Sequence, residues 1–416
     1  MERLLLLIPA LPLISALLVH LLDEPLGRRV ARLSIGFSLT GFVAAATVLG
    51  VALGGAEPRT LGFGLAWGSL LFDPLSALMA IVVAGISLIV HIYSQRYMAE
   101  ERGYARFYVL LDVMTAALLV MVSAADLITL LIAWHLIGVL LYFLLGQDTR
   151  SPTAYRYAFW TLFTYRVGDL PLLLAAALLY GAFGTWSLPE IFAALAAQPD
   201  TKTLFELPLA EVVGGLIVVS AFARSAQFLM HTWLPYTMGG PTPVSALMHA
   251  GIVNAGGFLI NRFAPVFVHT GDVLHWVFIV GLVTAVIGSV LMLTQHDIKK
   301  ALGYSTMGQM GFMIMECGVG AFSLAVYHLI AHGVFKGTLF LSAGGVINEA
   351  RKHDGVPKDE LYTYVVERRP APQRRPWLLM AGITLAVPGV ILFLAHYLVE
   401  AEFFHKQGAV VLLFFG

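Results

Sequence analysis

Long apolar runs, separated by short polar segments, recur along almost the whole chain. A helix needs ~20 apolar residues to cross the hydrocarbon core of a bilayer, and about twelve runs reach roughly that length. They predict transmembrane helices over residues 3–22, 33–54, 71–92, 107–123, 126–146, 156–182, 212–234, 242–264, 274–294, 300–317, 320–347 and 377–399. We therefore expect an all-α polytopic membrane protein with about twelve or more spans.

The two ends of the chain fit the same pattern. Residues 3–22 have no clear small-residue cleavage site and lead directly into further spans, so we interpret them as a retained helix and not as a signal peptide. A last apolar run starts at Ala409 and stops short at Gly416, which suggests either a shortened end or a segment completed beyond it.

Composition excludes several classes of protein. Of the 416 residues 59% are hydrophobic and 12% are charged, whereas charged residues make up about 25% of a typical soluble domain. A soluble enzyme, a nucleic-acid-binding protein and a disordered chain are therefore poor interpretations. The formal net charge of zero indicates no polyanionic partner. The single cysteine, Cys317, excludes a disulfide framework and a thiolate zinc or iron–sulfur site.

Lysine and arginine concentrate in the loops that follow odd-numbered helices. Because cytoplasmic loops carry an excess of these residues, we expect the odd-numbered loops in the cytoplasm and the N-terminus outside. The basic positions include Arg28, Arg29, Arg32, Arg96, Arg102, Arg106 and several residues between Arg351 and Arg375. The loop at 348–376 is also rich in proline, and it is either an ordinary connector or a docking surface for a soluble partner.

Several predicted spans contain ionisable residues, which normally face protein or water because lipid cannot solvate their charge. Arg166 and Asp169 are spaced to share a helix face, and the same holds for His328, His332 and Lys336. The candidate positions inside spans are His135, Arg166, Asp169, Arg224, His249, His328, His332, Lys336 and His396, with Asp73 and Asp297 nearer helix ends. Together they indicate a proton or ion path.

Each of these residues also has a structural interpretation. Arg166 and Asp169 are equally compatible with a buried charge pair, and His249 with a hydrogen-bonded packing residue. The spacing of His328 and His332 is that of a zinc pair, but the sequence offers no glutamate base and no evident third ligand beside them. We therefore expect no metal site and no cofactor in this chain.

Two predicted spans are interrupted by proline and glycine. Residues 234–243 contain Leu-Pro-Tyr-Thr-Met-Gly-Gly-Pro-Thr-Pro, and residues 387–390 contain Val-Pro-Gly-Val. Such breaks cannot continue a regular helix and tend to line cavities in transport proteins. We predict three regions: N-terminal helices at 1–106, a first repeat at 107–264 and a second repeat at 265–416.

The motifs resemble the antiporter-like membrane subunits of respiratory complex I and of Mrp cation/proton antiporters. The resemblance rests on Gly-Pro-Thr-Pro-Val-Ser-Ala-Leu-Met-His-Ala at 240–250, Tyr-Arg-Val-Gly-Asp at 165–169, Asp-Ile-Lys-Lys-Ala-Leu-Gly-Tyr-Ser-Thr-Met at 297–307, and the His328–Lys336 segment. It implies two inverted repeats of five helices, each with a broken helix, and a polar axis in the middle of the membrane. By position, Asp169, Arg224, His249, His328, His332, Lys336 and His396 would lie on this axis.

The sequence departs from that family at three positions. His135 and Arg224 stand where the family usually has a glutamate and a lysine, and His396 stands where it has a further lysine. Arginine does not release its proton as a buried lysine can, so the first half of the path differs from the usual glutamate–lysine switch. This pattern resembles the membrane subunits of DAB-type inorganic carbon pumps of bacterial inner membranes, whose partner is a soluble carbonic-anhydrase-like zinc protein.

The resemblance implies a proton-translocating subunit that energises conversion of CO2 to bicarbonate, with zinc held by the partner. Arg224 would act as a permanent charge, and His135, His328, His332 and Lys336 as the relay. One alternative is a proton-pumping subunit of complex I, of a membrane hydrogenase or of an Mrp antiporter. Another is a non-conducting scaffold that retains the fold and only anchors partners.

Overall fold

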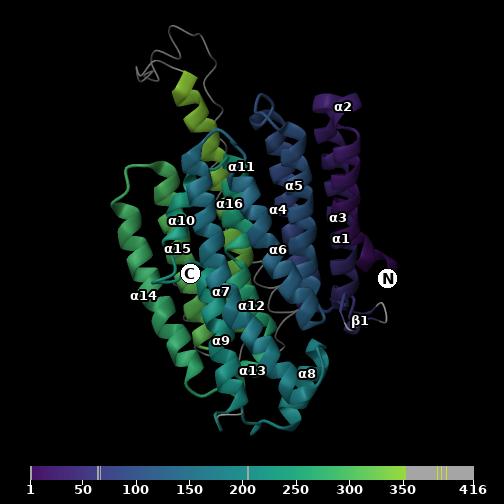
Figure 1. The fold of residues 1–416 in the computed structure, drawn as a ribbon, viewed down its shortest axis with the longest axis vertical. Coiled ribbons are helices and arrows are strands. Elements are labelled where there is room, and N and C mark those ends of the chain that lie inside the picture. The colour runs from purple at the N-terminus through teal and green to yellow at the C-terminus, as the bar shows by residue number, and fades with distance from the viewer. Residues whose placement is uncertain are drawn as a thin grey trace.

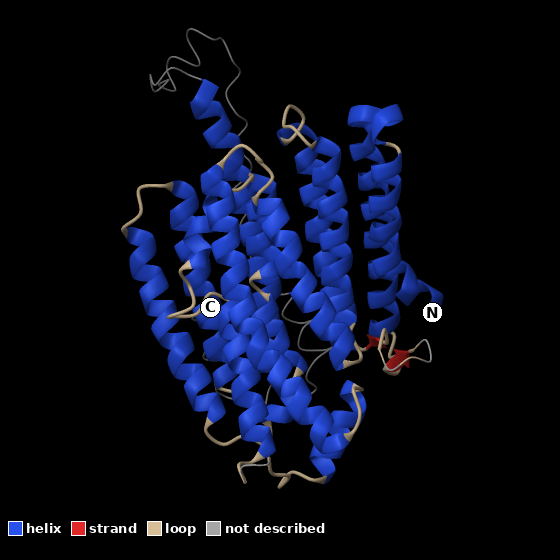
Figure 2. Cartoon of the chain, in the orientation of Figure 1, coloured by secondary structure: helices blue, strands red, loops and turns tan. Residues whose placement is uncertain are grey.

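A computed structural model describes residues 2–352, apart from 63, 64, 66, 204 and 205, together with residues 382, 386 and 390. Helices make up nearly all of this part, as Figures 1 and 2 show. Most of the loop at 348–376, the interruption at 387–390 except Val390, His396 and the last apolar run lie outside the described residues.

Sixteen helices follow one another along the described part of the chain. They are α1 (Glu2–Leu21), α2 (Asp23–Leu26), α3 (Val30–Leu53), α4 (Pro74–Tyr97), α5 (Tyr104–Ser123), α6 (Leu127–Leu145), α7 (Pro152–Phe183), α8 (Leu188–Ala197), α9 (Leu209–Arg224), α10 (Trp233–Tyr236), α11 (Thr242–Leu247), α12 (Ala255–Arg262), α13 (Ala264–Phe267), α14 (Val273–Leu293), α15 (Ile298–Gly318) and α16 (Phe322–Lys352). Single turns lie at η1 (Gly27–Arg29), η2 (Thr237–Gly239) and η3 (Met248–Ile252). Strands β1 (Arg59–Leu61) and β2 (Leu70–Phe72) form a small antiparallel pair.

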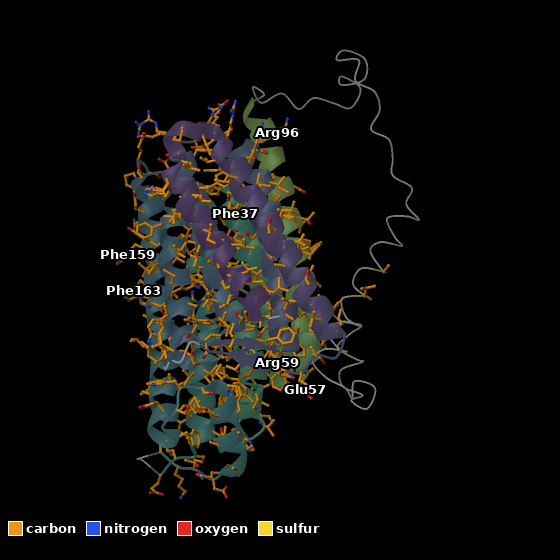
Figure 3. The ribbon with its side chains drawn as sticks, turned by 90° about the vertical axis from the view of Figure 1, so that its right-hand side faces the viewer. Phe37, Glu57, Arg59, Arg96, Phe159 and Phe163 are labelled. Atoms are coloured by element: carbon orange, nitrogen blue, oxygen red, sulfur yellow. The ribbon has the colours of Figure 1, made fainter. Side chains whose placement is uncertain are left out.

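The all-α membrane class predicted from the sequence is confirmed. In the described part of the chain, 9 helices are long and apolar enough to cross a bilayer. Their outer faces are apolar as well: Phe159 and Phe163 of α7 are 60% and 49% exposed and project sideways from the molecule (Figure 3). The division into three regions stays a prediction.

The break after the seventh predicted span starts earlier than the sequence pattern indicated. Helix α9 ends at Arg224, and Ala226 and Leu229 have φ values of 50° and 73°, in the left-handed region that interrupts a helix. A neighbouring helix binds one freed backbone group, since Phe228 N–H donates to Thr284 Oγ1. The Ser225 hydroxyl in the break donates to the Val253 carbonyl. The predicted helix over 212–234 is therefore wrong beyond residue 224.

This early break also changes the predicted polar stripe on that helix. Ser220 and Arg224 lie on α9, whereas Gln227 and His231 lie in the irregular segment before α10. The proline- and glycine-containing run at 234–243 forms α10, η2 and the start of α11. The cause of the early break is tertiary, since the residues at 225–229 include neither proline nor glycine.

The loops that were predicted to share one membrane side meet at one end of the molecule. A cavity of about 980 Å³ there is lined by residues of several loops, including Arg102, Arg106, Arg150, Asp297 and Lys299. Helix α2 also lies at this upper end, whereas α8 lies at the opposite end (Figure 1). The basic end of the protein is therefore built from segments far apart in sequence.

Helices α14 and α15 pack through paired glycines. Gly281 and Gly288 of α14 face Gly311 and Gly308 of α15. A Cβ atom added at Gly311 would lie 2.7 Å from the Gly281 carbonyl oxygen, and one added at Gly281 would lie 2.8 Å from the Gly311 carbonyl oxygen. Because backbone atoms cannot move aside as a side chain can, these positions require glycine.

Replacing Gly311 by valine should separate α14 from α15 and lower the free energy of unfolding by roughly 1–3 kcal/mol, the usual cost of overpacking. Thermal unfolding of the detergent-solubilised protein measures the effect. The matched control is Gly36→Val, because Gly36 is an exposed helical glycine with no atom near its Cβ direction. Equal melting temperatures for the two variants would contradict the close glycine packing.

Candidate functional site

Helices α6, α7 and α9 bring a group of charged side chains together inside the membrane region. Asp169 of α7 is 5% exposed. Its carboxylate lies 3.3 Å from Arg224 Nη2 and 3.1 Å from Arg166 Nη2. His135 Nδ1 lies 3.3 Å from the same carboxylate. The sequence predicted this pairing of Arg166 with Asp169, and the structure adds Arg224 and His135 to it.

Arg224 is held by aromatic rings as well as by Asp169. Its guanidinium lies 4.4 Å from the ring of Trp134 and 4.1 Å from the ring of Tyr165, and Nη2 donates to the Trp134 carbonyl over 2.7 Å. Cation–π contacts of this kind become stronger when the cation is removed from water. The side chain is 2% exposed, so Arg224 is a buried charge held in place by Asp169, Trp134 and Tyr165, although its Nη1 has no hydrogen-bond partner among the described residues.

His135 lies at the edge of this group, on the outer surface of α6. Its side chain is 57% exposed, and its ring contacts the Arg166 guanidinium, which also donates to the His135 carbonyl over 3.0 Å. A cavity of about 380 Å³ beside it is lined by Trp134, Asp169 and apolar residues of α6 and α7. His135 is therefore the accessible titratable member of the group.

A second group lies along α16. His328, His332 and Lys336 share one face of this helix, as predicted, and all three are buried. His332 Nδ1 lies 3.2 Å from Asn254 Oδ1. Since the Asn254 amide nitrogen donates to two carbonyl groups, its oxygen is the acceptor and His332 Nδ1 is the donor. His332 Nε2 has no protein partner among the described residues.

Lys336 is fully buried and contacts the facing helix α15. Its Nζ donates to Ser305 Oγ over 2.6 Å and lies 3.5 Å from the Leu302 carbonyl oxygen. Both partners are uncharged, and no carboxylate of the described residues forms an ion pair with Lys336. Lys336 therefore differs from Arg166 and Arg224 of the first group, which both face the Asp169 carboxylate.

Glu316 is a site residue that the sequence analysis missed. It is 1% exposed near the end of α15, and its Oε1 lies 3.1 Å from His328 Nδ1. The expectation that no glutamate lies beside His328 and His332 is therefore wrong. Glu316 stands between Met315 and Cys317 at the end of a predicted span, and the rule that intramembrane carboxylates mark functional sites could have identified it.

His249 lies on the π-helical turn η3, where the helix between α11 and α12 widens. Such turns are frequent at functional sites. The imidazole stacks on Phe340 with 4.2 Å between ring centroids, and neither ring nitrogen has a protein hydrogen-bond partner in the described part of the chain. His249 also interacts electrostatically with Lys336, so it belongs to the group on α16.

The two acidic residues predicted near helix ends cap helices. Asp73 accepts from Ser76 N–H at the start of α4 and pairs with Arg262 over 2.5 Å. Burial raises the pKa of Asp73, but the charge and hydrogen bonds of Arg262 lower it further, so that the pKa lies below its ordinary value. Asp297 caps α15 through Lys300 N–H. Both residues have structural roles at the helix ends.

The predicted site residues thus form two groups and not one continuous chain of contacts. The α7 group contains His135, Arg166, Asp169 and Arg224, and the α16 group contains His249, His328, His332, Lys336 and Glu316. Within residues 2–352 as described, no hydrogen bond or ion pair joins the groups directly, and no three His, Cys, Asp or Glu side chains converge as metal ligands. His396 lies outside the described residues.

Sequence comparison identifies relatives along nearly the whole chain. Residues 124–416 match the family model for the transmembrane region of NADH:quinone oxidoreductase and Mrp antiporter proteins, and residues 62–108 match that for the N-terminus of chain 5 of NADH-ubiquinone oxidoreductase (complex I). A probable inorganic carbon transporter subunit, DabB1 from Halothiobacillus neapolitanus, is 63% identical over 99% of this chain and 73% of its own length. Chloroplastic NAD(P)H-quinone oxidoreductase subunit 5 from Ipomoea purpurea is 36% identical over 78% of this chain, but that match covers 44% of the plant protein.

Solved structures share the fold. In the Mrp complex from Dietzia sp. DQ12-45-1b, one chain matches 99% of this chain with a TM-score of 0.76 and 28% identity, and the match spans 45% of that chain. A chain of the archaeal membrane-bound sulfane sulfur reductase matches with a TM-score of 0.76 and 18% identity, over 100% of this chain and 93% of its own. The chain belongs to the NADH:quinone oxidoreductase/Mrp antiporter family of membrane proteins, and within it to the relatives of the inorganic carbon transporter subunit DabB1.

Proposed function

We propose that this chain translocates protons across a bacterial inner membrane and thereby energises the accumulation of inorganic carbon. The observation that carries the proposal is the buried α16 group, in which Glu316, His328, His332 and Lys336 follow one another between two packed membrane helices. Similarity to DabB1 supports the choice of inorganic carbon as the species accumulated.

The α16 group has the chemistry of a proton relay. Glu316 contacts His328 over 3.1 Å, and the rings of His328 and His332 lie 6.3 Å apart between centroids. His332 donates from Nδ1 to Asn254, which leaves Nε2 free to accept a proton. A water molecule can bridge neighbouring groups at such separations, and imidazole exchanges protons near neutral pH. Protons would pass from Glu316 through the two histidines to Lys336 and His249.

The α7 group has a different role in this proposal. Arg224 keeps its proton and is neutralised by Asp169 within a shell of aromatic rings. It therefore supplies a constant positive charge where the family usually has a lysine that titrates. His135 remains as the titratable residue in the first half of the proposed path. Its exposed side chain lines the cavity of about 380 Å³ between α6 and α7.

The hydration chemistry belongs to a partner in this scheme. The described residues offer no group of three side chains that fits a catalytic zinc ion. We therefore assign zinc to a soluble carbonic-anhydrase-like partner of the DabA type. The basic end of the molecule, with its cavity of about 980 Å³, is proposed to face the cytoplasm, with the N-terminus outside.

The alternative functions make different use of the same residues. Family membership and the Mrp fold support a subunit of complex I, of a membrane hydrogenase or of an Mrp antiporter. The fixed charge of Arg224 supports a scaffold that anchors partners without conducting. These alternatives are separated by the partner that binds and by the need for Lys336.

Lys336→Ala should reduce proton-dependent inorganic carbon uptake by roughly 100-fold, because a positioned proton-transfer group contributes at least about that factor. Growth of a carbon-requiring strain at low CO2 and uptake of labelled bicarbonate measure the effect at matched expression. Lys202→Ala is the control, since Lys202 is 58% exposed in an ion pair with Glu206. Full uptake in the Lys336 variant would support the scaffold.

Glu316→Gln should also lower uptake by about 100-fold while the protein keeps its melting temperature. The amide can still accept a hydrogen bond from His328, so packing is preserved, but it cannot carry a proton. Proton flux into vesicles containing the purified complex separates this effect from assembly. The control is Glu206→Gln, because Glu206 is 82% exposed. Wild-type flux in Glu316→Gln excludes Glu316 from the path.

Affinity purification of the full-length protein from mild detergent should recover a soluble zinc-containing partner in stoichiometric amount, measured by metal analysis of the complex. The reason is that accumulation requires hydration chemistry that the described residues do not supply. Recovery of quinone oxidoreductase or Mrp subunits without a zinc protein would favour the alternative assignment.

A further inference from the structure

A third group of buried polar residues lies outside both groups described above. Helices α1, α3, α4 and α5 enclose it at the side of the molecule opposite α14 (Figure 1). At its centre is Asp112 of α5, which is 1% exposed, and beside it is His91 of α4, which is fully buried. A buried carboxylate in a membrane helix needs partners, because unpaired charge is costly there.

Asp112 binds one side chain from each of the other three helices. Ser15 of α1 and Ser34 of α3 donate to Oδ2 over 2.7 and 2.9 Å, and His91 Nε2 lies 3.1 Å from Oδ1. Hydroxyl groups that donate to Oδ2 leave that oxygen without a proton of its own. Any proton in the group therefore lies between Oδ1 and the imidazole.

The hydrogen bonds around His91 determine its protonation. Thr115 donates its hydroxyl proton to the Leu111 carbonyl over 2.9 Å, so in the 2.6 Å contact between Ser87 and Thr115 the donor must be Ser87. Ser87 then has no proton left for His91. His91 Nδ1 lies 2.7 Å from the Ser87 carbonyl and 3.2 Å from the Ser87 hydroxyl. Both atoms act as acceptors, and Nδ1 must carry a proton.

If Nδ1 carries the only ring proton of a neutral imidazole, then Nε2 has no proton and faces a carboxylate oxygen that also has none. Two acceptors at 3.1 Å repel each other, so the contact requires one more proton, either on Nε2 or on Oδ1. We propose that His91 and Asp112 form a buried site that binds one proton between Nε2 and Oδ1, separate from the α7 and α16 groups.

The described residues around Asp112 offer no other positive charge that could neutralise its carboxylate, which supports a bound proton. Hydrogen bonds and ion pairs to Asp112 come, within the described residues, only from Ser15, Ser34 and His91, and none comes from lysine or arginine. Helices α1 and α3 contribute serines. From α5, Tyr108 donates its hydroxyl to the His91 carbonyl over 3.0 Å and also interacts electrostatically with Asp112. Loss of the shared proton would leave a net negative charge buried among four helices.

The site also touches the rest of the protein through α4. On its other face this helix contacts the helices of the proposed path: Thr242 of α11 donates to Tyr97 over 3.1 Å, and Gly333 of α16 lies against Ile86. Gly333 lies between His332 and Lys336 of the α16 group in sequence. Release of the proton would leave two acceptors facing each other across the contact between α4 and α5, and α4 would carry that change toward α16.

The proton can be located spectroscopically in the full-length protein reconstituted in lipid nanodiscs. Histidine ring nitrogens are labelled with 15N, spectra are recorded by solid-state NMR at pH 8, and the His91 signal is assigned by its loss in His91→Gln. We expect both ring nitrogens of His91 to be protonated or, if the proton lies on Asp112, a protonated carboxyl stretch in the infrared spectrum. His275 of α14, which is exposed, is the internal control for labelling and detection.

Asp112→Asn is the matched variant. Its amide nitrogen can donate to His91 Nε2 while its oxygen still accepts from Ser15 and Ser34, so we expect a folded protein with a neutral His91 and no carboxyl stretch from this position. A wild-type His91 that is neutral, with the proton on Nε2 and an ionised Asp112, overturns the proposal. That wild-type measurement decides the question even if the variant fails to fold.

Discussion

The constraint that shapes this protein is that charge inside a membrane must find a partner within the protein. Asp169 is neutralised by Arg224 and Arg166, and Glu316 contacts His328. The contacts of Asp169 with Arg224 and of Glu316 with His328 each join two different helices, so satisfying the charge also fixes how the helices pack. The polar groups therefore determine the arrangement of a bundle whose apolar surfaces alone would pack in many ways.

The interruption after Arg224 follows from the same constraint. A continuous helix would have placed Gln227 and His231 on one stripe with Arg224, but the chain turns away through left-handed residues. Thr284 then accepts from the Phe228 N–H that the break exposes, and Ser225 in the break donates to the Val253 carbonyl. The break leaves Arg224 at a helix end, where its guanidinium reaches the Trp134 carbonyl and Asp169 together.

Sequence reasoning predicted the membrane class, most spans and the shared face of His328, His332 and Lys336, because these depend on local hydrophobicity and helical period. It also placed Asp73 and Asp297 near helix ends, where both form caps. It missed Glu316 and Asp112, although both carboxylates lie within predicted spans. Their partners, His328 and His91, come from other helices, and the rotation of one helix against another is not encoded in a local period.

The three polar groups stabilise buried charge in different ways. In the α7 group the arginines keep their protons, so His135 is the member whose charge can change. The α16 group and the His91–Asp112 pair combine imidazole with carboxylate, which permits a proton to move within a neutral pair. Helix α4 carries His91 and also packs against α11 and α16, so it connects the N-terminal helices with the helix that bears the α16 group. In the proposal above, a change of charge at His91 and Asp112 reaches the α16 group through this packing.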